Sequence, residues 1–143
     1  MEFLFAPCIR YNQYSRTEIM KTVLIIDHDI EELEALMDIC RLGLGTFTIL
    51  SSQDETCANT NLSKKRIDVA ICSSQFPDTE EWELLTRLTR RFPYIPFIGI
   101  SASGSIAEKT AKNIGISCLF TRPVDSGELV RQIDELSELS STG

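Results

Sequence analysis

Residues 67–77 have the sequence IDVAICSSQFP. Ile67 and the run from Val69 to Cys72 are apolar, which is typical of a strand buried on both faces of a parallel sheet. The run ends at Ser73, which is followed by two further polar, uncharged residues and then by Phe-Pro. In an open α/β sheet, functional groups lie just beyond the carboxyl ends of the strands. We therefore predict that Ser73 lies at the functional edge of such a sheet.

The rest of the chain repeats this pairing of a short apolar run with an amphipathic stretch. The expected strands are residues 23–26, 46–50, 67–72, 97–101 and 117–120. Apolar residues at helical spacing predict helices at residues 30–44, 53–65, 80–92, 106–114 and 126–139. Ile30, Cys57 and Trp82 are among the residues expected to anchor these helices to the core. Five β–α units predict a three-layer α/β domain, a doubly wound (βα)5 fold with a five-stranded parallel sheet between two helical layers.

A capping-box pattern precedes each expected helix. In this pattern an N-cap side chain that carries an oxygen atom is followed three residues later by Glu. The matching pairs are Asp29/Glu32, Ser52/Glu55, Asp78/Glu81, Ser105/Glu108 and Asp125/Glu128. A single match is a weak signal, but five matches, each between a strand and a helix, support the whole β–α order.

Composition limits the kind of protein. The chain has 143 residues, enough for one domain with a substantial core. Its formal net charge of −7 argues against broad binding to nucleic acid or to anionic membranes. No apolar run approaches the roughly 20 residues that a membrane-spanning helix needs. We expect a cytoplasmic protein in which residues 22–140 form the domain and residues 1–21 are an N-terminal extension of unknown role.

The cysteines form no C-x-x-C pair and the chain has a single histidine, His28, so no structural zinc site is predicted. Scattered cysteines in apolar surroundings are commonly small core residues in a reducing compartment. We favour this interpretation for the five cysteines, which are Cys8, Cys40, Cys57, Cys72 and Cys118. A thiol redox sensor that uses Cys72 is the alternative.

Four segments together resemble the receiver domains of response regulators. They are VLIID at 23–27, IDVAICSSQFP at 67–77, FIGISA at 97–102 and GISCLFTRP at 115–123. The resemblance implies a flavodoxin-like domain of a bacterial two-component phosphorelay. In that family a histidine kinase supplies a phosphoryl group to an aspartate that ends the third strand. Acidic residues after the first strand help to hold Mg²⁺, while a Thr or Ser and a Lys contact the phosphoryl group.

This sequence departs from the family pattern at most of the reacting positions. Asp27 matches the first acidic residue, but His28 stands at the second acidic position. Asp29 is acidic one place later, where we expect it to cap the first helix. Ser73 stands in the place of the phosphoacceptor aspartate, and Arg122 in the place of the lysine. The resemblance therefore implies a receiver whose reactive centre has been lost.

Two further positions concern the conformational switch of the family. Ser101 fits the Thr or Ser position after the fourth strand. Leu119 stands three residues before Arg122, where active receivers carry an aromatic side chain. We therefore expect the aromatic coupling of active receivers to be absent.

The departures argue against the chemistry of the family. An acyl phosphate needs a carboxylate nucleophile, and Mg²⁺ prefers carboxylate oxygens to an imidazole. We expect no metal, no cofactor and no enzymatic activity. The guanidinium of Arg122 suits pairing with a carboxylate, so it either approaches Asp27 or the Ser73 region or remains solvated.

The expected function is signalling through protein–protein contact. By resemblance the contact surface lies at about residues 105–139, and the partner is a protein, a histidine kinase or an output domain. Two alternatives stay open. One is a receiver that is switched by phosphorylation or another modification at Ser73 or Asp27, and the other is the redox sensor at Cys72.

Overall fold

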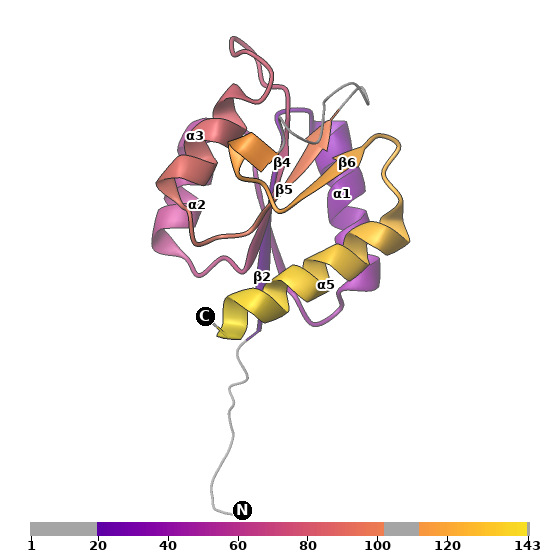
Figure 1. The fold of residues 1–143 in the computed structure, drawn as a ribbon. Coiled ribbons are helices and arrows are strands. Elements are labelled where there is room, and N and C mark those ends of the chain that lie inside the picture. Colours follow the sequence, from indigo (N-terminus) through magenta and orange to yellow (C-terminus); the bar gives the residue numbers. More distant parts are fainter. Residues whose placement is uncertain (1–19, 102–111, 143) are drawn as a thin grey trace, which may run out of the picture.

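A computed structural model describes residues 20–101 and 112–142 of the chain (Figure 1). The extension as far as residue 19, the Ser105/Glu108 pair and most of the helix expected at 106–114 lie outside the described residues. The strands are β2 (Thr22–Ile26), β3 (Thr48–Ser52), β4 (Val69–Ser73), β5 (Phe97–Ser101) and β6 (Cys118–Thr121). The helices are α1 (Ile30–Gly43), α2 (Glu55–Lys64), α3 (Glu83–Arg91) and α5 (Ser126–Thr142).

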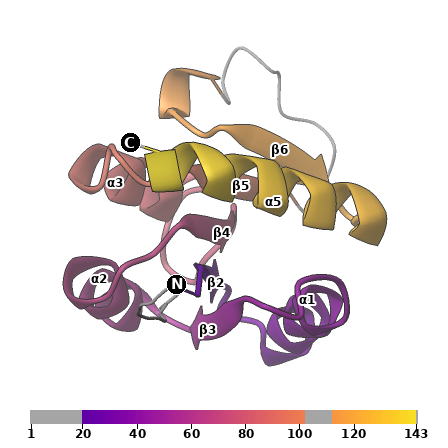
Figure 2. The same cartoon turned by 90° about the horizontal axis from the view of Figure 1, so that it is seen from below.

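The five strands form one sheet in the order β3-β2-β4-β5-β6, and each neighbouring pair is parallel. The chain places β3 on one side of β2 and then adds β4, β5 and β6 on the other side, so its helices cover both faces of the sheet. Figure 2 shows α1 and α5 on one face and α2 and α3 on the other. The predicted fold, a doubly wound parallel sheet between two layers of helices, is confirmed.

The core consists of two apolar layers, one on each face of the sheet. Alternate residues of a strand point to opposite faces. Val23 and Ile25 accordingly pack in the layer that includes side chains of α1 and α5, whereas Leu24 and Ile26 pack with those of α2 and α3. The central strand β4 is buried along its whole length, as the apolar run at 67–72 predicts.

Several predicted strand and helix boundaries are wrong by a few residues, and one residue predicted to lie in the core is exposed. Strand β4 continues to Ser73, so this residue ends the strand rather than following it. Strand β3 begins at Thr48, two residues later than expected, and α5 extends to Thr142. The side chain of Ile30 is 51% exposed and does not join the core, because it begins α1 at the open edge of the sheet.

Two of the predicted N-caps are confirmed. The Asp29 side chain accepts hydrogen bonds from the backbone N–H groups of Glu31 and Glu32. The Asp125 Oδ1 atom accepts a hydrogen bond from the N–H of Glu128 at 3.0 Å. These contacts satisfy amide donors that have no partner inside the first turn of a helix.

The Ser52/Glu55 prediction is wrong. The N-cap of α2 is Asp54, whose Oδ1 atom accepts from the N–H of Cys57 at 2.7 Å. Ser52 instead ends β3, and its hydroxyl contacts the Cys57 thiol and the Asn61 side chain. The cap lies two residues later because β3 itself continues to Ser52.

The Asp78/Glu81 prediction is also wrong, and α3 begins at Glu83 instead of Glu80. Its N-cap is Trp82, in a left-handed conformation with φ of 72° and no side-chain capping bond. The Glu81 carboxylate is used elsewhere, because it accepts a hydrogen bond from the Ser74 hydroxyl at 3.1 Å. The connection between β4 and α3 is therefore longer than the sequence pattern predicts.

The indole of Trp82 packs directly over Gly99 in β5. A Cβ atom at Gly99 would lie 2.9 Å from Trp82 Cζ3 and 3.0 Å from Ile116 Cδ1. We expect Gly99→Ala to lower the free energy of unfolding by about 1–3 kcal/mol, because these side chains must shift. Gly45→Ala is the matched control, since nothing lies within 4 Å of its added Cβ. Urea denaturation of both variants checks this, and equal stabilities would contradict the packing.

Candidate functional site

The parallel register brings the predicted site residues to one edge of the sheet. Ile26 of β2 is paired with Cys72 of β4, so Asp27 and Ser73 follow on adjacent strands. The N–H of Arg122 donates to the carbonyl of Ser101 at 3.1 Å, which places these two residues together as well. Ser73 and Ser101 are the last residues of β4 and β5, and Asp27 and Arg122 directly follow β2 and β6, so all four lie at the carboxyl edge.

The Asp27 carboxylate is the buried charge of this edge, with its residue only 1% exposed. Its Oδ2 atom accepts a hydrogen bond from Arg122 Nη2 at 2.8 Å, and its Oδ1 atom accepts from the N–H of Asp29 at 3.0 Å. Burial raises the pKa of Asp27, although the hydrogen bond from the Asp29 N–H and the positive charge of Arg122 oppose that rise. Asp27 is therefore held by a cation of the protein itself.

Arg122 links three elements of the fold. Besides Asp27, its guanidinium faces the Glu32 carboxylate in the first turn of α1, with Nε 2.6 Å from Oε2. This is a charge contact without hydrogen-bond geometry, since the buried Nε–H has no hydrogen-bond partner within the described part of the chain. The side chain of Arg122 is 21% exposed. The pairing hypothesis for Arg122 is confirmed, and the solvated alternative is wrong.

Glu32 is a member of this cluster that the capping-box pattern does not predict. The capping-box pattern assigns its side chain to the N–H of Asp29. That N–H instead donates to Asp27, while the Glu32 carboxylate faces Arg122. The sequence indicates only that Glu32 lies in the first turn of the helix that follows Asp27.

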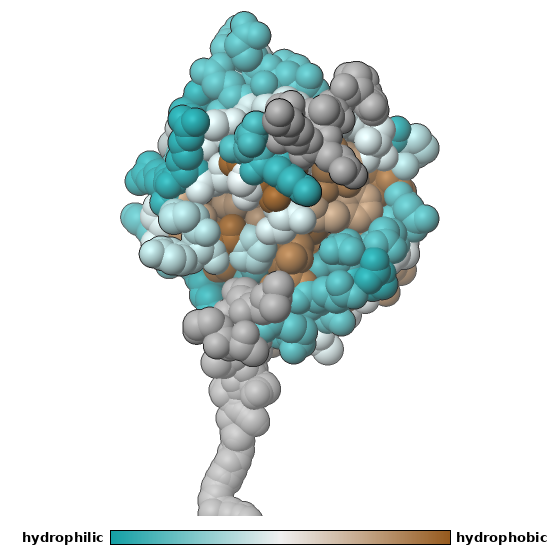
Figure 3. Space-filling model, in the orientation of Figure 1, coloured by the Kyte–Doolittle hydropathy of each residue, from teal (hydrophilic) through white to brown (hydrophobic). Residues whose placement is uncertain are grey.

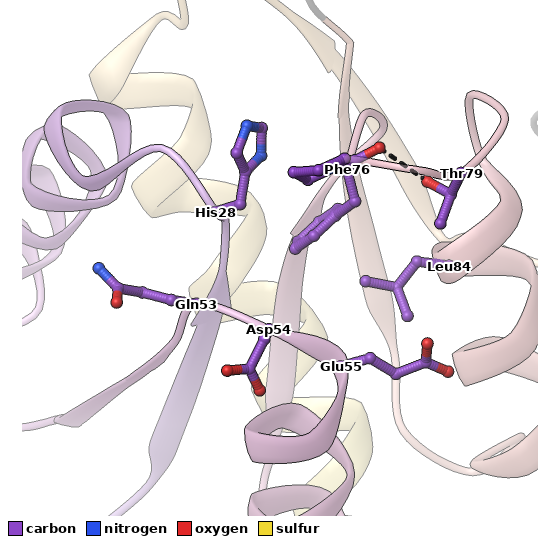
Figure 4. A pocket seen from close by; sticks show the side chains of 8 residues that line it. His28, Gln53, Asp54, Glu55, Phe76, Thr79 and Leu84 are labelled. Carbon is purple, nitrogen blue, oxygen red and sulfur yellow. Dashed lines mark hydrogen bonds between the residues drawn. The ribbon is translucent and has the colours of Figure 1, made fainter.

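His28 lies beside the site but is directed to the other face of the sheet. Its Nδ1 atom is 3.9 Å from Asp27 Oδ1, and its ring centroid is 5.5 Å from that of Phe76. Figure 4 shows the imidazole and the Phe76 ring on the same hollow. No hydrogen bond among the described residues joins His28 to the Ser73 hydroxyl.

Ser73 is 5% exposed. Its hydroxyl oxygen accepts a long hydrogen bond from the backbone N–H of Gln75, with 3.5 Å between the oxygen and the nitrogen. Ser101 is fully buried at the end of β5. Leu119 packs with the α2/α3 layer of the core, while the neighbouring Phe120 packs with the α1/α5 layer. The position of the switch aromatic in active receivers is therefore filled by an aliphatic side chain on the sheet.

This donor set does not suit Mg²⁺. The ion favours octahedral coordination by hard oxygen ligands and is usually held by carboxylates. Arg122 already occupies the Oδ2 atom of Asp27 and also faces the Glu32 carboxylate. In residues 20–101 and 112–142, no group of three or more His, Cys, Asp or Glu side chains could hold a metal ion.

The described thiols differ sharply in exposure. Cys40 and Cys72 are buried, Cys118 is half-buried and Cys57 is exposed. The prediction that Cys57 anchors α2 is wrong, since Ala58 and Leu62 are the buried residues of that helix. Burial, together with the charge of Asp27, raises the pKa of the Cys72 thiol, and burial raises that of Cys40 to about 11.

These environments predict the order in which the described thiols react. Because the thiolate is the nucleophile, iodoacetamide should modify Cys57 in the native protein and leave Cys40 and Cys72 unmodified until urea is added. Peptide mass spectrometry at timed intervals measures this order. Cys57→Ser should abolish the rapid phase assigned to that site. Rapid native modification of Cys72 would contradict the buried environment and favour the redox-sensor alternative.

Comparison with known proteins identifies the fold. No family model matches the sequence. The transcriptional regulatory proteins GlrR of Escherichia coli (strain K12) and QseF of Escherichia coli O157:H7 are each 24% identical to the chain over 120 residues. The match covers 83% of this chain but 27% of each relative, so the chain spans about a quarter of the length of the curated relatives it matches.

Solved receiver domains superpose closely. A CheY-like response regulator receiver domain protein from Methanospirillum hungatei JF-1 has a TM-score of 0.74 at 19% identity, over 87% of this chain and 98% of that one. The signal receiver domain of an HD domain-containing protein from Pseudomonas fluorescens Pf-5 has a TM-score of 0.74 at 22% identity, over 87% and 100%. The chain therefore has the receiver fold. None of the described helices is long and apolar enough to cross a membrane.

Proposed function

We propose that this receiver-fold chain is a signalling domain of the two-component type that is not phosphorylated at Ser73. It acts in the cytoplasm through contact with a protein partner and catalyses no reaction. The observation that carries this proposal is the ion pair at the carboxyl edge. The Arg122 guanidinium donates to Asp27 at 2.8 Å and lies beside Glu32, so a protein cation neutralises the carboxylate that a metal would need.

The chemistry of Ser73 supports the same proposal. A serine hydroxyl becomes a nucleophile when an adjacent base takes its proton. Of the two candidate bases, His28 lies against Phe76 on the opposite side of the sheet from α1, and the Asp27 carboxylate is already paired with Arg122. Ser73 continues the alternation of Val69 and Ile71, which places its side chain on the α1/α5 face.

The ion pair also gives the domain one fixed arrangement. Arg122 stands in the connection between β6 and α5, Asp27 follows β2, and Glu32 belongs to α1. A switching receiver needs an equilibrium between two states of comparable free energy. The three-way contact favours one state, so the domain works as a constant docking module.

The proposed contact surface is the one that the resemblance implies, about residues 105–139. Its described part contains β6, an edge strand of the sheet, and α5. Ile116, Cys118 and Leu119 are partly exposed there, and Figure 3 shows hydrophobic residues on this side of the molecule, between α3 and α5. A histidine kinase or an output domain is the partner class that suits this surface.

The alternative is a receiver that is switched by modification of Ser73 or Asp27. Asp27 has both carboxylate oxygens in hydrogen bonds, and Ser73 is only 5% exposed. Both observations disfavour the alternative, and a modified residue found by mass spectrometry would establish it.

A titration of the chain with Mg²⁺, monitored by isothermal titration calorimetry, tests the proposal. The wild-type chain should give no saturable heat at millimolar Mg²⁺, because Arg122 occupies the Asp27 carboxylate. The variant His28→Asp/Ser73→Asp/Arg122→Lys adds two carboxylates to that of Asp27 and removes the guanidinium, so it should bind the ion under the same conditions. Saturable binding to the wild-type chain would contradict the proposal.

A further inference from the structure

A hollow of about 250 Å³ opens at the carboxyl edge, on the α2/α3 side of the sheet. It is formed where the connections after β2, β3 and β4 meet, so residues distant in sequence line it (Figure 4). Phe76 and Leu84 make its apolar floor and are only 5% and 2% exposed. The imidazole of His28 forms one wall, and Asp54 and Glu55 stand at the opposite side. Asp27 and Ser73 do not line it, so this hollow is separate from the ion-pair site.

The size of the hollow limits its occupant. Drug-sized ligands usually occupy pockets of roughly 300–1,000 Å³. The volume here is smaller, about 250 Å³, and matches a single bulky apolar side chain. Burial of one such side chain contributes enough to anchor a flexible segment.

The surroundings of the hollow carry a strong negative charge. Two short segments around it, residues 54–55 and 78–83, contain six carboxylates. They are Asp54, Glu55, Asp78, Glu80, Glu81 and Glu83. Two of these carboxylates are paired with Arg87. Its guanidinium nitrogens lie 2.7 Å from a carboxylate oxygen of Glu55 and 2.7 Å from one of Glu83. A second copy of this chain, with a net charge of −7, is a poor electrostatic match for such a rim.

We propose that this acidic hollow binds one bulky apolar side chain of a partner protein, from a segment with Lys or Arg on both sides of that anchor. The apolar floor takes the anchor, and the carboxylates around it attract the flanking cations. The inference rests on the proposed function, because it names the partner chemistry for a domain that works by protein contact. It adds a second contact to the one at residues 105–139, on the face of the sheet covered by α2 and α3.

A peptide-binding experiment on the full chain tests this inference. The probe is the fluorescein-labelled peptide KRKFKRK, followed by fluorescence anisotropy at low salt without Mg²⁺ or a phosphoryl donor. Replacing its Phe with Ser should weaken binding about tenfold or more, because the anchor is lost. The peptide EEEFEEE, which keeps the anchor, should not bind. Equal binding of the Phe and Ser peptides would overturn the proposal.

Variants of the protein separate the anchor from the charge. Thr79 lines the hollow and is half-buried, so Thr79→Phe should fill it and weaken the peptide about tenfold. Glu80→Lys should weaken it about two- to fivefold, whereas Asp38→Lys, at an exposed position of α1 that does not line the hollow, is the matched control and should leave it unchanged. Unchanged binding to a folded Thr79→Phe variant, or equal effects of the two charge reversals, would overturn the proposal. The peptide comparison on the wild-type chain decides the matter if Thr79→Phe does not fold.

Two other occupants give distinct results. If Phe3→Ser/Phe5→Ser in the full chain tightens peptide binding tenfold, the chain's own N-terminal segment fills the hollow, and the partner assignment is overturned. Self-association in sedimentation experiments that Thr79→Phe abolishes would assign the hollow to a second copy, with the same consequence. Failure of the peptide to bind overturns this inference and leaves the claim about Ser73 unaffected, because no phosphoryl donor is present.

Discussion

Arg122→Met is expected to lower the free energy of unfolding by about 2–4 kcal/mol at pH 7, because it leaves a buried carboxylate without its cation. The side chain of Asp27 is 2% exposed and that of Arg122 is 21% exposed, so little water is available to replace the guanidinium. Methionine keeps most of the volume of the stem, which separates the loss of charge from the loss of packing. Urea denaturation gives the size of the effect.

The effect should depend on pH in a defined direction. Burial already raises the pKa of Asp27 above its ordinary value of 3.8, and removal of Arg122 raises it further. An acid whose pKa is raised by folding contributes its full stability below the unfolded value and loses it as the pH rises through the folded value. The difference between Arg122→Met and wild type should therefore be largest at pH 7 and shrink as the pH falls toward 3.8.

Two controls isolate the buried pair. Arg41→Met removes an exposed cation that pairs with Asp38 on α1, and should cost less than about 1 kcal/mol. The double variant Asp27→Asn/Arg122→Met should recover part of the stability lost in the single variant, since no buried charge remains. If Arg122→Met costs no more than Arg41→Met at every pH, the ion pair does not hold the site.

The second large effect is a gain of phosphoryl acceptance. His28→Asp/Ser73→Asp/Arg122→Lys is expected to change a chain that takes up no phosphoryl group from acetyl phosphate into one in which most molecules do so with Mg²⁺. The first two substitutions supply carboxylates for the ion and for nucleophilic attack. The third substitution, Arg122→Lys, replaces the planar guanidinium group with a compact ammonium group. Intact mass spectrometry reads the product.

The control for this gain keeps the shape of the acceptor and removes its nucleophile. Ser73→Asn in the same background, with His28→Asp and Arg122→Lys, should show no added phosphoryl group. Phosphorylation of that control would place the reaction at another residue. A failure of the Asp variant to react, although it binds Mg²⁺, would mean that features beyond these three positions prevent the chemistry.

The fold could be predicted from the sequence because its signals are local and repeated. Each buried strand is a short apolar run, and each helix shows apolar periodicity over several turns. The predictions failed where several local patterns compete. Asp54 and Ser52 both suit an N-cap, and the choice between them depends on where β3 ends. The start of α3 depends on Trp82, whose left-handed conformation no simple pattern indicates.

The site was predictable in its members but only partly in its contacts. Strand ends identify Asp27, Ser73 and Arg122 as neighbours, because parallel strands present their carboxyl ends at one edge. The direction of each side chain depends on contacts across long sequence distances. Glu32 was assigned to a local cap, and its contact with Arg122 follows from the packing of α1 against the sheet.

The most direct test of the central claim is the intact mass of the wild-type chain after incubation with acetyl phosphate and Mg²⁺. We expect an unchanged mass, because the Ser73 hydroxyl is buried and Asp27 is paired with Arg122. The His28→Asp/Ser73→Asp/Arg122→Lys variant in a parallel sample shows that the reagent is active. A wild-type adduct of one phosphoryl group, mapped to Ser73 or Asp27, would contradict the account.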